Sequence, residues 1–178
     1  KKEISFVKKL ISLRKEHPLL NRTHYQHGKV ISAKTNLPDI SWFNCRGQLM
    51  QENDWHDGSI KCFSMLLADI HNEKNTTTKK TNHTNSNEYH DDALLIIFNA
   101  HQSDIEYTLP AIDGYWQCLL DTANNFTNSS ANKSSKNITT STVKAYAHSC
   151  LVLSFHKNFK IHQDQEAHRS ELRKIRIK

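Results

Sequence analysis

The hydrophobic pattern is clearest at residues 91–110, where it predicts two adjacent strands. Residues 94–98 form a continuous apolar run of strand length, and Ile105, Tyr107 and Leu109 alternate with polar neighbours, as in a strand with one buried face. The polar residues 99–104 predict a connection that joins the two strands as an antiparallel pair. Because two strands alone are not stable, we expect partners at 41–44, 116–120 and 149–155. The pattern therefore predicts an all-β core of short strands.

The first twenty residues have a helical period instead. Their apolar side chains recur among basic ones and predict an amphipathic helix that needs a surface to cover: Ile4, Phe6, Val7, Leu10, Ile11 and Leu13. Pro18 cannot donate a backbone hydrogen bond and disfavours helical geometry at His17, so the helix should end there. We expect its partner surface to lie outside this sequence. With no initiator Met, signal pattern or membrane-length apolar run, we expect the C-terminal piece of a longer soluble, cytoplasmic protein.

The rest of the chain divides into short elements and polar tracts. We expect strands at 40–43 and 62–69, a turn at 44–47, a short helical or turn segment at 51–58 and a possible short strand at 30–32. Tracts near 71–90 and 124–141 are rich in Asn, Thr, Lys and Ser, so we expect expanded hairpin loops there. The predicted organisation is a helix (1–20), a linker (21–39), a β-sandwich domain (40–160) and a basic tail (161–178).

Composition narrows the function classes only a little. The net charge of +6 permits binding to nucleic acid or an anionic surface, but the only dense basic cluster is 169–178. We therefore do not expect nucleic acid or a membrane as a partner. An alternative is that the tail binds nucleic acid or an anionic surface, with an affinity that falls as salt is added. The cysteines lack C-x-x-C spacing and are expected to be reduced and structural: Cys45, Cys62, Cys118 and Cys150.

Several phrases in a fixed order resemble a known family. They are LRKEHPLL (13–20), ISWFNCRGQLMQENDW (40–55), ALLIIFNAHQSDIEYTLP (93–110), GYWQCLLDTA (114–123) and CLVLSF (150–155). The series is similar to the C-terminal region of bacterial glycogen debranching enzymes of the isoamylase type, which are members of the α-amylase superfamily of glycoside hydrolases. It covers roughly residues 4–155, apart from the two Asn-rich tracts.

The resemblance implies a mainly β fold: an antiparallel β-sandwich C-terminal domain, preceded by the last helix of a (β/α)8 barrel. It implies that the parent enzyme hydrolyses α-1,6-glucosidic branch linkages of glycogen or limit dextrin, with two carboxyl groups about 5 Å apart. Those groups lie at the ends of barrel strands that precede this sequence, so no catalytic residue and no cofactor is assigned to it. Its implied partners are the barrel, which it would pack on and stabilise, and α-glucan through the parent.

Candidate site residues remain within this picture. Trp42 and Trp55 are candidates for substrate binding because flat aromatic rings stack on sugars, but large aromatics also fill interfaces between domains. Trp116 alternates within a strand and is expected in the core. A carbohydrate-binding module that anchors the enzyme on glycogen is therefore the first alternative.

Other polar side chains carry weaker signals. The carboxylates flank strands or turns, where Asp is common for local reasons: Asp54, Asp57, Asp91, Asp92, Asp104, Asp113 and Asp121. The histidines fit no ligand spacing, so no structural metal site is expected: His71, His83, His90 and His101.

Overall fold

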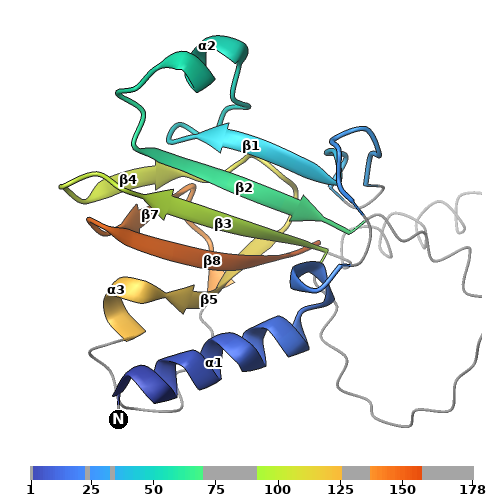
Figure 1. Cartoon of the computed structure of the whole chain (residues 1–178). Coiled ribbons are helices and arrows are strands. Elements are labelled where there is room, and N and C mark those ends of the chain that lie inside the picture. The colour runs from blue at the N-terminus through green and yellow to red at the C-terminus, as the bar shows by residue number, and fades with distance from the viewer. Residues whose placement is uncertain (1, 23–24, 33–34, 70–91, 126–136, 158–178) are drawn as a thin grey trace, which may run out of the picture.

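A computed structural model describes residues 2–22, 25–32, 35–69, 92–125 and 137–157. Within these residues, an antiparallel six-stranded sheet has the strand order β1-β2-β3-β8-β5-β6 (Figure 1). Its strands are β1 Ile40–Asn44, β2 Cys62–Ala68, β3 Ala93–Asn99, β8 Ser149–His156, β5 Tyr115–Asp121 and β6 Asn137–Ile138. A second, two-stranded sheet pairs β4 (Ile105–Thr108) with β7 (Thr142–Ala145). The helices are α1 (Lys2–Glu16), η1 (Pro18–Leu20), α2 (Glu52–His56) and α3 (Thr122–Asn125).

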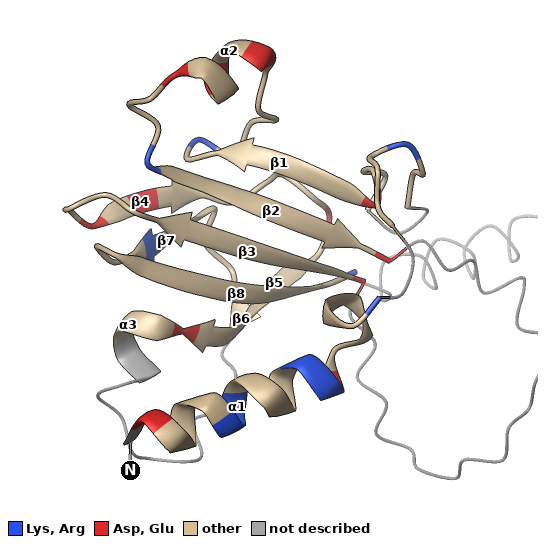
Figure 2. Cartoon of the chain, viewed as in Figure 1, with Lys and Arg blue, Asp and Glu red and all other residues tan. Residues whose placement is uncertain are grey.

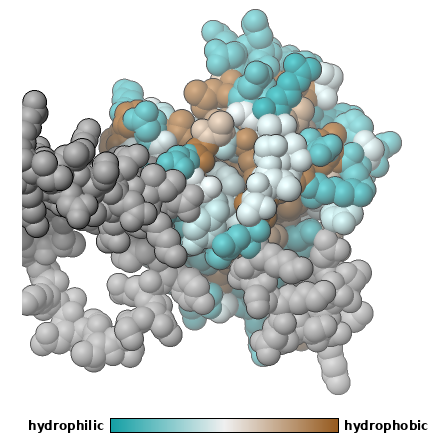
Figure 3. Space-filling model, turned by 180° about the vertical axis from the view of Figure 1, so that it is seen from behind, coloured by the Kyte–Doolittle hydropathy of each residue, from teal (hydrophilic) through white to brown (hydrophobic). Residues whose placement is uncertain are grey.

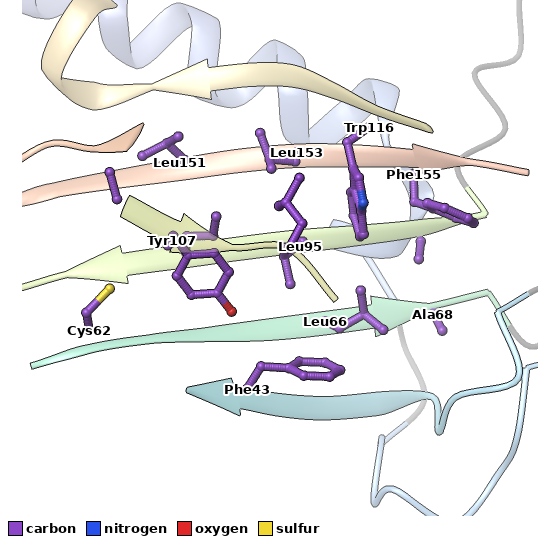
Figure 4. Close-up of a cluster of buried hydrophobic side chains, with 14 residues drawn as sticks. Phe43, Cys62, Leu66, Ala68, Leu95, Tyr107, Trp116, Leu151, Leu153 and Phe155 are labelled. Carbon is purple, nitrogen blue, oxygen red and sulfur yellow. The ribbon is translucent and has the colours of Figure 1, made fainter. Parts of the chain in front are cut away.

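The main core lies between the two sheets (Figure 4). Alternate residues of the long strands, such as Leu95, Ile97 and Leu153, point into it and are fully buried. Tyr107 of β4 enters from the small sheet, and its hydroxyl shares a 2.6 Å hydrogen bond with Ser64 Oγ of β2. This bond satisfies two buried hydroxyls and links the layers, as buried polar groups require. The mainly β, antiparallel architecture predicted from the sequence is confirmed.

Helix α1 covers part of the opposite face of the six-stranded sheet, beside β5 and β8 (Figure 1). Leu13 forms a second buried cluster with Leu120 of β5 and Val152 of β8, and Phe6 and Leu10 pack against that cluster. The helix ends at Glu16, next to His17, as Pro18 predicts. The expectation that the apolar surface of α1 needs a partner outside this sequence was wrong for Phe6, Leu10 and Leu13. These side chains pack on the chain's own sheet.

The predicted pairing of residues 94–98 with residues 105–109 was also wrong. β3 pairs with β2 and β8, whereas β4 pairs with β7 in the other sheet. The connection crosses between the layers at Asn99, whose side-chain amide donates to the carbonyl oxygens of Ser103, Ala145 and Tyr146. This fixed crossover replaces the hairpin that the polar spacing suggested.

The shorter predicted elements have mixed outcomes. Strands β1 and β2 confirm the predictions at 40–43 and 62–69. Gly47 has the positive φ of a turn residue, which confirms the turn at 44–47, and α2 confirms the helical segment at 51–58. The possible strand at 30–32 is reduced to one bridge between Ile31 and Pro38. The tract predicted as a loop at 124–141 contains β6, so that expectation was wrong for Asn137–Ile138. The tract at 71–90 and the tail from 161 onward lie outside the described residues.

Candidate functional site

Helix α1 carries a second apolar stripe that the sheet does not cover. Ile4, Val7 and Ile11 are exposed by 62%, 50% and 50%, although they belong to a folded helix. Positions spaced by three and four residues share one side of a helix, so these side chains form a continuous stripe. We call Ile4, Val7 and Ile11 the outer stripe of α1. Exposed apolar groupings of this kind mark surfaces that bind another molecule or domain.

An aromatic surface lies on the same face of the six-stranded sheet as α1. The strand registers oppose Trp42 to Met65, Met65 to Ile96, and Ile96 to Val152, and Val152 contacts α1. Directly opposed residues point to the same side of a sheet, so this row runs from β1 to the helix. The aromatic surface comprises four rings on β1, β2, β3 and α2: Trp42, Phe63, Phe98 and Trp55.

One T-shaped and two tilted ring contacts join these four rings. The ring centroids of Trp42 and Trp55 are 5.5 Å apart, in a T-shaped arrangement. Phe63 lies 6.1 Å from Trp42 and 5.4 Å from Phe98. These separations suit favourable aromatic pairs. Trp42 is half-buried, whereas Trp55 is 52% exposed, so Trp55 is the ring that a partner can reach.

Local hydrogen bonds hold Trp55 in place. The N–H of Met50 donates to the Trp42 carbonyl oxygen at 2.9 Å, which ties the segment before α2 to β1. Asp54 Oδ2 accepts from the N–H of Gln51 at 2.8 Å and thereby caps α2. Together with the ring contact, these bonds bring the two sequence-predicted site residues, Trp42 and Trp55, side by side. Trp116 is buried in the core, as predicted.

The charge distribution marks this face as apolar. Figure 2 shows strands β1, β2, β3 and β8 without Lys, Arg, Asp or Glu, while charged residues lie on the helices, in connections and on the small sheet of β4 and β7. Glu52 and Asp54 on α2 border the aromatic surface. The face therefore suits an apolar or neutral partner better than a highly charged one.

Two of the candidate carboxylates, Asp57 and Asp104, have structural contacts. Asp57 accepts from the N–H of Ser59 at 2.8 Å, and hydrogen bonds from Ser59 lower its pKa. Asp104 bridges Lys144 at 2.9 Å, which lowers the pKa of the carboxyl group and raises that of the amine. Such bonds are typical of turns and surface ion pairs. Asp91 lies outside the described residues.

The histidines do not form a metal centre within the part of the chain that the structure describes. There, no three His, Cys, Asp or Glu side chains come close enough to hold a metal ion. His101 Nδ1 lies 2.7 Å from Ser103 Oγ in the connection after β3. His71, His83 and His90 fall outside the described residues.

A partly buried ionic contact in the segment after α1 could not be predicted from the sequence. Arg22 donates to the carbonyl oxygen of Ala68 at 2.6 Å and lies 3.8 Å from Asp69. Burial lowers the Arg22 pKa, and attraction to Asp69 and Asp39 opposes that shift. The contact fastens the segment after α1 to the end of β2. A single Arg in a polar segment gave no periodic signal that could reveal it.

Two hollows lie away from α1. A groove of about 750 Å³ lies beside β4, β5 and β6, and none of its lining residues is charged: Thr108, Leu109, Pro110, Ala111, Ile112, Gly114, Tyr115, Trp116, Asn137, Ile138, Thr139, Thr140 and Ser141. A cavity of about 360 Å³ lies where β1 ends and β2 begins, and its lining includes Cys45, Cys62 and His101.

Seen from behind, the molecule shows apolar and pale side chains in the middle of its face and hydrophilic ones around them (Figure 3).

Comparison with known proteins decides the family. Residues 39–153, more than half of the chain, match the family described as "Isoamylase, C-terminal". The chain belongs to the isoamylase C-terminal family. The resemblance noted from the sequence is thereby confirmed.

Similar proteins support this family assignment. The "Glycogen operon protein GlgX homolog" of Mycobacterium bovis is 30% identical over 122 residues, and the protein of the same name in Mycobacterium tuberculosis has the same identity. The aligned region covers 67% of this chain but only 16% of each relative. The chain thus corresponds to a small part of these proteins. In the described residues, no helix is both long enough and apolar enough to span a bilayer.

Proposed function

We propose that this domain packs on and stabilises the catalytic barrel of a glycogen debranching enzyme, which hydrolyses α-1,6-glucosidic branch linkages. The observation that carries the proposal is the outer stripe of α1, which is apolar and exposed although the other stripe is packed on the sheet. Family membership supports a barrel as the partner. Helix α1 suits the position of the last barrel helix, because one stripe packs on the sheet and the other is exposed. In this proposal residues 1–20 belong to the barrel, residues 40–160 form the accessory sandwich, and the domain supplies no catalytic residue.

The aromatic surface extends the proposed contact. It lies on the same face as α1, next to an uncharged set of strands, and presents Trp55 to a partner. Trp is enriched among residues that dominate interface energies. We therefore assign interdomain packing to Trp42 and Trp55 together with the outer stripe.

The gene segment upstream of the Lys1 codon gives the first test. We expect it to encode, in frame, a barrel with a nucleophilic Asp and an acid/base Glu. In the whole protein, Val7→Asp with Ile11→Asp places two charges in the proposed interface and should lower the unfolding temperature by about 5 °C or more. The specific activity on glycogen limit dextrin, measured well below that temperature, should stay unchanged.

A matched control uses polar positions of the same helix. Ser5→Asp with Ser12→Asp adds the same charge at exposed sites outside the stripe. It removes only the exposed Ser12–Glu16 hydrogen bond and places a like charge beside Glu16, so the unfolding temperature should fall much less than in the stripe variant. Equal effects of the two double variants would contradict docking through the outer stripe. A decayed or absent barrel upstream would contradict the stabilising role.

A second candidate function is glycan anchoring through Trp42 and Trp55. The half-exposed Trp55 ring, supported edge-on by Trp42, favours it. In this case the chain should migrate more slowly in a gel that contains glycogen than in a gel without it. Trp55→Ala should weaken the affinity for glycogen, derived from this retardation, about tenfold. Leu49→Ala is the control, because Leu49 is similarly exposed at 47%. Unretarded migration of the unmodified chain would rule out this function.

A further inference from the structure

Two cysteines lie close together where β1 ends and β2 begins. Phe43 pairs with Ser64, and Asn44 pairs with Phe63, which is the last pair of the ladder. Cys45 begins the turn that follows Asn44, and Cys62 precedes Phe63 as the first residue of β2, so the two cysteines lie just beyond this last pair. Paired residues of antiparallel strands have Cα atoms about 4.5–5.5 Å apart, and this spacing applies to the adjoining Asn44–Phe63 pair. A disulfide bond spans about 4.4–6.8 Å between Cα atoms, so this position is compatible with one.

The surroundings of the two thiols show that they share one environment. Cys62 belongs to the main core, and Cys45 packs against the same cluster from its edge. Both line the cavity of about 360 Å³, through which the half-buried Cys45 is accessible. Burial raises the pKa of Cys62 to about 11, and repulsion from Cys45 adds to this shift. Both thiols also contribute to the raised pKa of Tyr107, so all three groups lie within electrostatic range of one another.

The other two cysteines are arranged differently. Cys118 of β5 pairs with Leu153, and Cys150 of β8 pairs with Phe98, so neither faces a cysteine in the sheet registers. They provide an internal comparison, because Cys45 and Cys62 line one cavity, whereas neither Cys118 nor Cys150 lines it.

We propose that Cys45 and Cys62 form a redox-sensitive dithiol that a low-molecular-weight disulfide, such as glutathione disulfide, converts into a cross-strand disulfide bond. The Cys45 thiolate attacks one sulfur of glutathione disulfide, which forms a mixed disulfide and releases one glutathione thiolate. Cys62 loses its proton to solvent, attacks the Cys45 sulfur and releases the second glutathione thiolate. The two cysteines are oxidised by two electrons, and the glutathione disulfide is reduced to two thiols.

The new bond would close residues 46–61 into a loop. This segment carries α2 and Trp55, so oxidation would restrain the most exposed ring of the aromatic surface. A disulfide that closes a loop of this length stabilises mainly by restricting the unfolded chain. The dithiol follows from the geometry alone and does not depend on the proposed docking role.

The test is equilibration of the full chain in glutathione buffers of increasing oxidised fraction, followed by alkylation of free thiols and mass mapping. We expect a Cys45–Cys62 crosslink in the unmodified chain and in the Cys118→Ser/Cys150→Ser variant, and none after Cys45→Ser. The unfolding temperature of the oxidised protein should rise by roughly 5–10 °C. A mixed disulfide on Cys45 only, unreacted thiols at both positions, or a crosslink through Cys118 or Cys150 would each overturn the proposal. If the double variant fails to fold, mass mapping of the unmodified chain decides.

Discussion

At the scale of single residues, Gly114 shows how tightly the start of β5 packs against the end of β8. A Cβ atom at this position would fall well inside van der Waals contact with the His156 carbonyl oxygen and the Phe155 ring. Because backbone and a core ring cannot easily move away, Gly114→Ala should reduce the free energy of unfolding by about 2–3 kcal/mol.

Gly58 provides the matched control, because a Cβ atom there would meet nothing within 4 Å. Gly58→Ala should therefore change the free energy of unfolding by less than about 0.5 kcal/mol. Urea denaturation of both variants measures the difference. Equal free energies of unfolding for the two variants would contradict tight packing of Gly114 between β5 and β8.

Sequence reasoning succeeded for residues whose role follows from periodicity. Trp116 alternates with polar neighbours along a strand, and this pattern alone placed it in the core. Trp42 and Trp55 were singled out by residue type, but their contact depends on how α2 folds back on β1. Arg22 was missed because its partner Ala68 lies 46 residues away and no local pattern links the two.

At the scale of the element, α1 has two apolar stripes, and substitutions in them should differ in how much they lower the free energy of unfolding of this chain. Leu13 is buried against Leu120 and Val152, so Leu13→Ala should lower the free energy of unfolding by about 2–4 kcal/mol. Ile11 on the outer stripe is half exposed, so Ile11→Ala should lower it by less than about 1 kcal/mol. Denaturation of the 178-residue chain by urea compares them. A reversed order would contradict the packing of α1 on the sheet.

The strands show where element-level prediction stops. Apolar runs and alternation located β1, β2, β3, β4, β5 and β8, because burial of one or both faces imposes those patterns. They did not identify partners, since the period says which side is buried but not which strand lies alongside. The error over β3 and β4 follows from this limit, and the deciding contact is the Asn99 amide with the loop after β7.

At the scale of the whole molecule, the fold class and family could be read from the sequence, but the surface could not. The ordered phrases and the alternating strands indicated a sandwich, which the two sheets confirm. Which apolar residues remain exposed depends on the docking of α1, and hydrophobicity alone does not distinguish Ile11 from Leu13. The candidate docking surface therefore emerged only from the three-dimensional arrangement.

One buried and two partly buried thiols make the stability of the whole domain sensitive to alkaline pH. Burial raises the pKa values of Cys62, Cys118 and Cys150 to about 11, above the ordinary value of 9.0. Between these values the folded state keeps protons that the unfolded chain loses, so the free energy of unfolding must fall as the pH rises from about 9 towards 11. Below pH 8 these groups are protonated in both states and cause no slope.

Thermal unfolding between pH 7 and 11 under reducing conditions measures this effect. The unmodified chain should lose stability most steeply above pH 9, and replacement of Cys62, Cys118 and Cys150 by Ala should flatten that part of the curve while lowering stability at pH 7. Tyr107, whose pKa burial also raises, leaves a residual decline at the alkaline end. An unchanged slope in the triple variant would show that the three thiols are accessible to solvent, and it would contradict their placement in the packed sheets.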